Sequence, residues 1–76
     1  MSRNEVYTMI SSNPEIMHGK PCVKGTRIPV SLVVSMLADG MSEEEILKDY
    51  PSLKRSSIKA SLKYASMMCE HETVKI

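Results

Sequence analysis

The sequence predicts a mainly α-helical domain, a tri-helical helix-turn-helix bundle with a short N-terminal pair of β-strands. Apolar residues recur at helical spacing in three segments after residue 29, and the connections between these segments are short. Residues 1–29 instead hold three of the four prolines and two of the three glycines, which favours short strands and turns. We therefore interpret residues 1–76 as a single domain, with a strand and loop region at 1–29 and a three-helix unit at 30–72.

Two β-prone segments predict the N-terminal strands. Tyr7–Ile10 is the first, and Thr26–Ile28, between a glycine and a proline, is the second. Two short strands are marginally stable alone, so they are expected to pack on the helices. They could pair within one chain or between two chains. Gly25 is expected to provide a backbone conformation rather than chemistry.

The first helix is predicted at residues 30–39. Its apolar positions are Val30, Val33, Val34 and Leu37. Gly40 follows as a C-terminal stop, because glycine readily adopts the left-handed conformation that ends many helices.

The second helix is predicted to begin after Ser42 and to end before Pro51. Ser42 and Glu45 have the spacing of a capping box, and Met41 with Ile46 can form a hydrophobic staple. Three glutamates in the first turn complement the helix dipole.

The third helix is predicted from about Lys54 to Glu70, with Leu53 plugging the core from the preceding turn. The expected apolar face consists of Ile58, Leu62, Ala65 and Cys69, flanked by Tyr64 and Met68. The pair Met67–Met68 is expected in the core or at an interface, since methionine surfaces adapt to protein contacts.

Charge is unevenly distributed in this nearly neutral chain, whose net charge is +1. Residues 42–53 have a net charge of −3, whereas residues 54–64 contain four cations and no acid. Arg55, Lys59 and Lys63 are one helical turn apart and form a stripe. Cations with small neighbours are typical of a DNA-recognition helix, although many such stripes are only solvated helix faces. The predicted DNA-binding residues are Lys54, Arg55, Ser56, Lys59, Ala60 and Lys63.

The loop at residues 18–30 could also contact a nucleic-acid backbone, through Lys20, Lys24 and Arg27. It lacks the Gly-Lys-Ser/Thr ending of a P-loop. For Arg27, we favour an ion pair with Asp39 or Asp49 over a phosphate or protein contact.

No metal, cofactor or enzyme activity is predicted. His18, Cys22, Cys69 and His71 lack the paired spacing of structural zinc sites. No nucleophile elbow is present, and Glu43–Glu45 are better explained as a helix start.

The chain has neither a signal-peptide core nor an apolar run of the roughly 20 residues needed to span a bilayer. A cytoplasmic protein with two reduced cysteines is therefore expected. The core lacks Phe and Trp, so a partner or second copy, most simply a homodimer, is expected to cover part of the surface. The tail from Thr73 could add a strand to a partner.

An ordered series of motifs resembles the bacterial and archaeal domain-of-unknown-function family 433 over roughly residues 7–68. These motifs are Asn13–Ile16, Gly19–Pro21, Gly25–Val30, Ala38–Ser42 and Tyr50–Pro51. The resemblance implies a homeodomain-like fold and the antitoxin of a toxin–antitoxin pair, whose toxin is often a PIN-like ribonuclease. It also implies autoregulation by promoter binding.

One departure from the family pattern favours nucleic acid. Relatives usually begin the third helix with a Thr cap followed by acidic residues, where this chain has Lys54–Ser57. Ser52 could then act as the cap from a shifted start. The sequence therefore predicts a DNA-binding antitoxin, and the alternative is a protein-interaction or dimerisation module without DNA binding.

Overall fold

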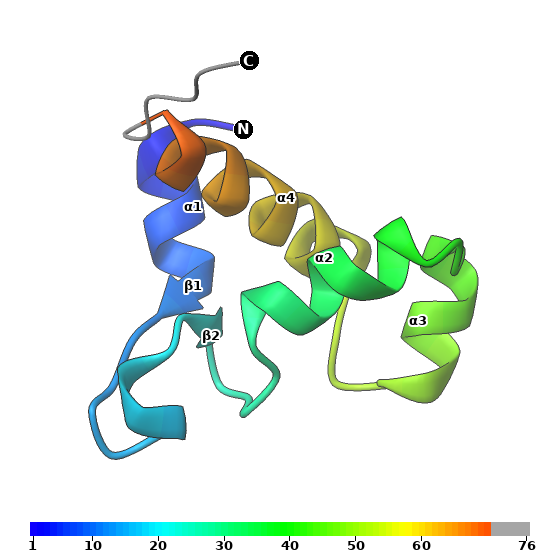
Figure 1. Cartoon of the computed structure of the whole chain (residues 1–76), viewed down its shortest axis with the longest axis horizontal. Helices are drawn as coiled ribbons and strands as arrows, with labels where there is room; N and C mark the ends of the chain where they lie inside the picture. Colours follow the sequence, from blue (N-terminus) through cyan, green and yellow to red (C-terminus); the bar gives the residue numbers. More distant parts are fainter. Residues whose placement is uncertain (71–76) are drawn as a thin grey trace.

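The computed structural model describes residues 1–70, which form four α-helices and two short paired strands (Figure 1). The mainly helical fold with an N-terminal strand pair is confirmed. In chain order the elements are α1 (Arg3–Met9), β1 (Ile10–Ser11), the 3-10 helix η1 (Met17–Gly19), β2 (Cys22–Val23), α2 (Val30–Ala38), α3 (Glu43–Asp49) and α4 (Arg55–Cys69). No helix within residues 1–70 has both the length and the apolar character required to cross a membrane.

Helices α2 and α3 begin and end close to the predicted positions. Gly40 has φ +93° and ends the α2 segment, as the sequence predicts. The capping box of α3 is present: Glu45 N–H donates to Ser42 Oγ, and Ser42 N–H donates to Glu45 Oε1, both at 3.1 Å. Ile46 is fully buried, and Met41 packs against the core beside it.

Helix α1 replaces most of the first predicted strand. Tyr7–Met9 are helical, and only Ile10 of the predicted segment lies in a strand. The cause is local, because Ser2 forms a capping box with Glu5 that fixes the first turn. The helix then buries Val6 completely.

The second strand was predicted too late in the chain. Strand β2 pairs antiparallel with β1 in the same chain, with Ile10 opposite Val23 and Ser11 opposite Cys22. Residues 24–27 form a turn and a bend instead, because Thr26 Oγ1 donates to the Val23 carbonyl at 2.8 Å and accepts the Ile28 N–H at 3.0 Å. Gly25 has φ +79° in this turn, which confirms its conformational role.

Helix α4 crosses the molecule and packs against α2 and α1 (Figure 1). Its buried residues are Ser57, Ile58, Ala60, Ser61 and Met67. Of the apolar face predicted for this helix, Ile58 is correct, whereas the Leu62 side chain is 44 % exposed and Cys69 is exposed. The face of α4 that packs in the core therefore includes the small residues of the helix, which allow neighbouring backbones to approach closely. The Ser61 hydroxyl remains satisfied by donating to the Ser57 carbonyl at 2.9 Å.

The start of α4 lies at Arg55, with Lys54 as the N-cap residue. Ser52 is therefore outside the helix and does not provide the cap. Instead, the Lys54 N–H donates to Ser57 Oγ at 3.1 Å, which fixes the first turn. Leu53 is buried in the turn before it, as predicted.

Candidate nucleic-acid interface

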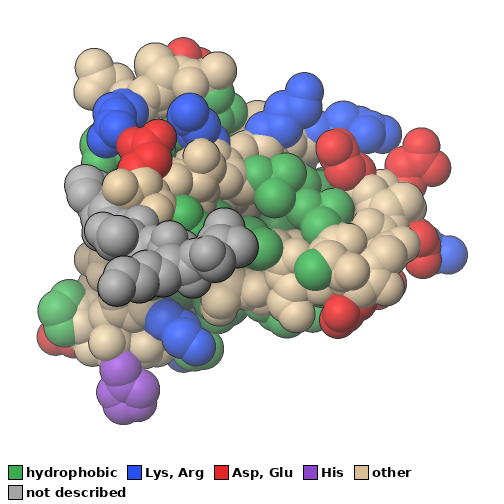
Figure 2. Space-filling model, turned by 45° about the horizontal axis from the view of Figure 1, so that its top comes forward, with side chains coloured by type: hydrophobic (Ala, Val, Ile, Leu, Met, Phe, Trp, Pro, Cys, Tyr) green, Lys and Arg blue, Asp and Glu red, His purple; other side chains and the backbone are tan. Residues whose placement is uncertain are grey.

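The exposed face of α4 holds most of the predicted cationic stripe. Lys54, Arg55 and Lys59 are exposed, and Lys63 is half-buried. Figure 2 shows two groups of Lys and Arg side chains along one edge of the molecule, with Asp or Glu side chains beside each group. Arg55, Lys59 and Lys63 therefore lie on successive turns of one face of α4, whereas Lys54 precedes the helix and lines a cavity described below.

The two small residues predicted beside this stripe differ in position. Ser56 is half-buried and lies at the edge of the stripe. Ala60 is fully buried in the core, so its predicted contact with DNA is wrong. The small side chain of Ala60 serves the packing of α4 rather than access to a base.

Arg55 is the only α4 cation with an ion pair among residues 1–70. Its Nη1 lies 3.3 Å from Glu43 Oε2, and its Nη2 lies 3.9 Å from Glu44 Oε1. The Arg55 side chain is 60 % exposed, so water screens these pairs and each contributes at most about 1 kcal/mol. The guanidinium group therefore remains accessible to another anion.

The three loop cations do not form one cluster. Arg27 is exposed, and within residues 1–70 it has no ion pair with Asp39, Asp49 or any other acid, so the predicted pair is wrong. Lys20 lines an apolar groove, whereas Lys24 lines a polar cavity together with Lys54. Of the three loop cations, Lys24 is therefore the one that lies near the start of α4.

The polar cavity has a volume of about 330 Å³ and lies where the end of α1, the segment after β2 and the start of α4 meet. Its lining residues are Thr8, Met9, Val23, Lys24, Ser52, Lys54, Ser56 and Ser57. No pattern in the sequence indicates this cavity, because the cavity depends on α1, which was not predicted.

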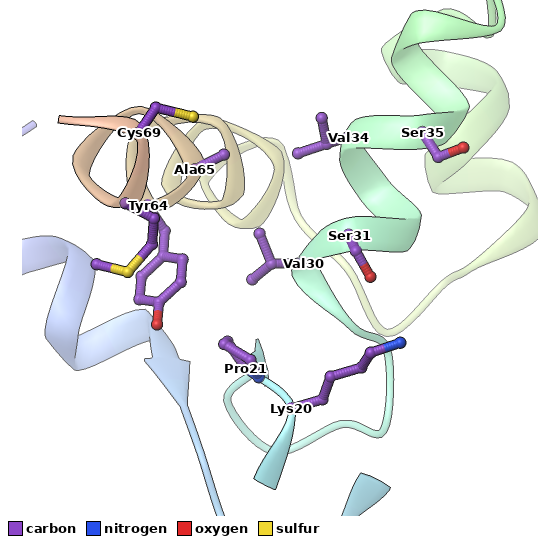
Figure 3. Close-up of a pocket in the computed structure, with 10 residues that line it drawn as sticks. Lys20, Pro21, Val30, Ser31, Val34, Ser35, Tyr64, Ala65 and Cys69 are labelled. Carbon is purple, nitrogen blue, oxygen red and sulfur yellow. The ribbon is translucent and has the colours of Figure 1, made fainter. Parts of the chain in front are cut away.

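An apolar groove of about 560 Å³ lies between α2 and the second half of α4 (Figure 3). Val30 and Val34 of α2 face Ala65 of α4 across it. Sequence reasoning missed this groove, because it assigned Ala65 and Cys69 to the core.

The cysteines and histidines do not converge in the described part of the chain. Cys22 is buried, and its Sγ donates to the Lys20 carbonyl at 3.3 Å. Cys69 is exposed on α4. Among residues 1–70, no group of three or more His, Cys, Asp or Glu side chains could hold a metal ion. His71 and the tail from Thr73 lie outside the described residues.

The methionine pair near the end of α4 divides between core and surface. Met67 is fully buried, whereas the Met68 side chain is 40 % exposed and lines the apolar groove. The first methionine therefore anchors the core, and the second is available for a contact.

Comparisons with known proteins identify relatives of unknown function. The family model described as "Protein of unknown function (DUF433)" matches residues 10–65. Uncharacterized protein y4eO of Sinorhizobium fredii is 40 % identical over 57 residues, which cover 75 % of this chain and 26 % of that protein. This chain thus spans about a quarter of that relative's length.

A solved structure supports the fold. The crystal structure of a DUF433 member from Anabaena variabilis superposes with a TM-score of 0.77 at 28 % identity. The match covers 88 % of this chain and 69 % of the other chain. The likeness therefore includes most of the described fold.

Proposed function

The chain belongs to the DUF433 family of proteins of unknown function, and we propose that this member binds double-stranded DNA through the basic face of α4. The observation that supports this most directly is the exposed row of cations on α4. Lys54, Lys59 and Lys63 have no ion pair within residues 1–70. Cations without protein partners on one helix face are suited to neutralising phosphates.

The dimensions of α4 agree with this proposal. The helix has 15 residues and is therefore about 22 Å long. Arg55, Lys59 and Lys63 occupy successive turns of one face, and the major groove is about 12 Å wide, sufficient for a helix. Because Ala60 is buried, the contacts come from the cations and from Ser56 at the edge of the face. Phosphate contacts therefore supply most of the affinity.

DNA from upstream of the gene tests this proposal in a salt series. The logarithm of the affinity is expected to fall linearly with the logarithm of salt concentration, with a slope of about −0.9 for each phosphate neutralised. The double variant K59E/K63E is expected to abolish binding. The matched control is K48E, which makes the same type of charge reversal at an exposed position on α3. An affinity that ignores salt, or equal losses per substitution in both variants, contradicts the proposal.

The apolar groove supports a homodimer as part of the same proposal. Lys20 and Cys69 lie at opposite ends of the groove, and Glu70 follows Cys69 directly (Figure 3). A second copy of the chain packed on this apolar groove would form a two-fold dimer. Two α4 helices then reach two half-sites on DNA.

The groove also favours the second candidate function, a dimerisation module that does not bind DNA. The variant V34E places a charge in the groove, and it is expected to convert the dimer to a monomer in sedimentation velocity. The matched control is A38E, at an exposed position of the same helix outside the groove. A dimer that lacks salt-dependent DNA binding would favour the second candidate. A wild-type monomer, or a V34E variant that remains dimeric, contradicts the groove as the dimer interface.

The antitoxin role rests on the family resemblance. In this role the chain represses its own operon and neutralises a co-encoded PIN-like ribonuclease in the cytoplasm. Co-expression with the neighbouring gene product is expected to give a stable complex that inhibits the ribonuclease. A failure of the two products to copurify would remove the support for this role and would leave DNA binding to be judged by the salt series.

A further inference from the structure

The polar cavity brings together two lysines that are far apart in the sequence. Lys24 follows β2 and Lys54 precedes α4, and both are exposed where they line this cavity of about 330 Å³. No Asp or Glu is among its lining residues. Within residues 1–70, neither lysine forms an ion pair. Two like charges share this cavity, and a bound anion would be attracted to both of them.

The backbone holds both lysines in place while their side chains remain available. Lys24 N–H donates to the Met9 carbonyl at 2.8 Å. Lys54 N–H donates to Ser57 Oγ at 3.1 Å. These bonds fix the backbone at both lysines and leave both ammonium groups free to reach an anion.

Hydroxyl groups complete a donor set that suits a phosphate. Ser52 and Ser56 line the cavity, and their hydroxyls have no hydrogen-bond partner within residues 1–70. Two ammonium groups and two hydroxyls can donate to several oxygens of one anion. A phosphate group presents several such oxygens and forms charge-assisted hydrogen bonds with lysine.

We propose that this cavity binds one phosphate group, held by Lys24 and Lys54, and that in the complex with DNA this is a backbone phosphate. The assignment to DNA rests on the proposed function. Lys54 directly precedes Arg55, where the α4 stripe begins, and Ser56 also lines the cavity, so the cavity adjoins the start of the stripe. The bound phosphate fixes the position of α4 along the duplex, since phosphate contacts orient a protein without reading sequence.

A salt series on four proteins tests the site in the DNA complex. These are wild type, K24A, K54A and the double variant K24A/K54A. Because both lysines hold the same phosphate, the double variant is expected to reduce the salt slope by about one contact rather than two. It is also expected to weaken binding uniformly across DNA sequences. The matched control is K48A, at an exposed position on α3 outside the cavity, which should leave slope and affinity unchanged.

A titration with inorganic phosphate, followed by amide NMR, tests the site without DNA. The amides of Lys24, Lys54 and Ser56 are expected to shift saturably, and K24A/K54A is expected to abolish these shifts. Thermal unfolding of each variant shows whether it is folded, as expected for substitutions of exposed lysines.

The two measurements separate the site from the proposed function. Saturable phosphate shifts with no DNA binding by the wild type support the site and contradict the proposed function. Saturable shifts together with an unchanged slope in the double variant support a site for free phosphate and overturn its assignment to DNA. Salt-dependent DNA binding by α4, with an unchanged slope in the double variant and no phosphate shifts, overturns the site alone.

Discussion

The guanidinium group of Arg55 lies 3.3 Å from the Glu43 carboxylate and joins the first residue of α4 to the first residue of α3. This pair places the acidic start of α3 beside the basic face of α4. It lies at the exposed surface, where the interaction contributes little to stability. Its main effect is on the electrostatic potential that a DNA phosphate meets at Arg55.

Removing these carboxylates is expected to strengthen DNA binding. In E43Q/E44Q, the affinity should rise several-fold at low salt, because Arg55 loses its competing anions. The free energy of unfolding should change by less than about 1 kcal/mol. The control is E15Q, which removes one carboxylate charge from an exposed loop position, whereas E43Q/E44Q removes two. Equal effects of the two variants per charge removed would show that only net charge matters.

The observed orientation of α4 predicts unequal costs at two of its apolar residues. Ile58 is fully buried, so I58A is expected to lower the free energy of unfolding by about 2–5 kcal/mol. Because Leu62 is 44 % exposed, L62A is expected to lower the free energy of unfolding by less than about 0.5 kcal/mol. Urea denaturation of both variants measures the difference. A comparable loss in L62A would contradict the described face.

Glu5 gives the fold a local dependence on pH. Hydrogen bonds from the Ser2 backbone N–H and from the Ser2 hydroxyl lower the Glu5 pKa below its usual 4.5. Ionised Glu5 therefore stabilises the folded state fully above pH 4.5, and this stabilisation is lost as the pH falls through the lowered pKa. In S2A, an NMR titration of the Glu5 carboxyl carbon should show a higher pKa than in wild type. An unchanged pKa would mean that the hydroxyl has no part in the shift.

The turn after β2 requires a left-handed residue. Gly25 has φ +79°, and a Cβ added there would meet nothing within 4 Å, so the cost of substitution is conformational rather than steric. G25A is expected to lose about 1–2 kcal/mol of unfolding free energy. G25N should lose less, because asparagine visits this region more readily. Thermal unfolding should rank wild type, G25N and G25A in descending stability, and any other order would contradict this explanation.

The sequence predicted the helices that have strong local signals. The capping box of Ser42 and Glu45 predicted the start of α3, and Gly40 predicted the end of α2. The same signal, Ser2 followed by Glu5, is present before α1, whereas the β-prone residues Tyr7–Ile10 favour a strand. Helix α1 was therefore predictable from its cap.

The orientation of α4 was harder to predict, because its core face depends on tertiary packing. Small polar residues such as Ser57 and Ser61 are buried only because α4 approaches α1 and α2 closely. A count of large apolar residues instead selects Leu62 and Cys69. For the same reason Ala60, which is fully buried, was predicted to lie on the exposed face that contacts DNA. The stripe of Arg55, Lys59 and Lys63 was predictable, since it needs only helical periodicity.

Val6 of α1 and Met67 near the end of α4 are both fully buried in a single core, and α4 packs directly on α1. During synthesis, the apolar side of α1 therefore stays uncovered until α4 has emerged from the ribosome. This core can be completed only after the ribosome has released the last turns of α4, and a product truncated within α4 would leave α1 unprotected against proteolysis.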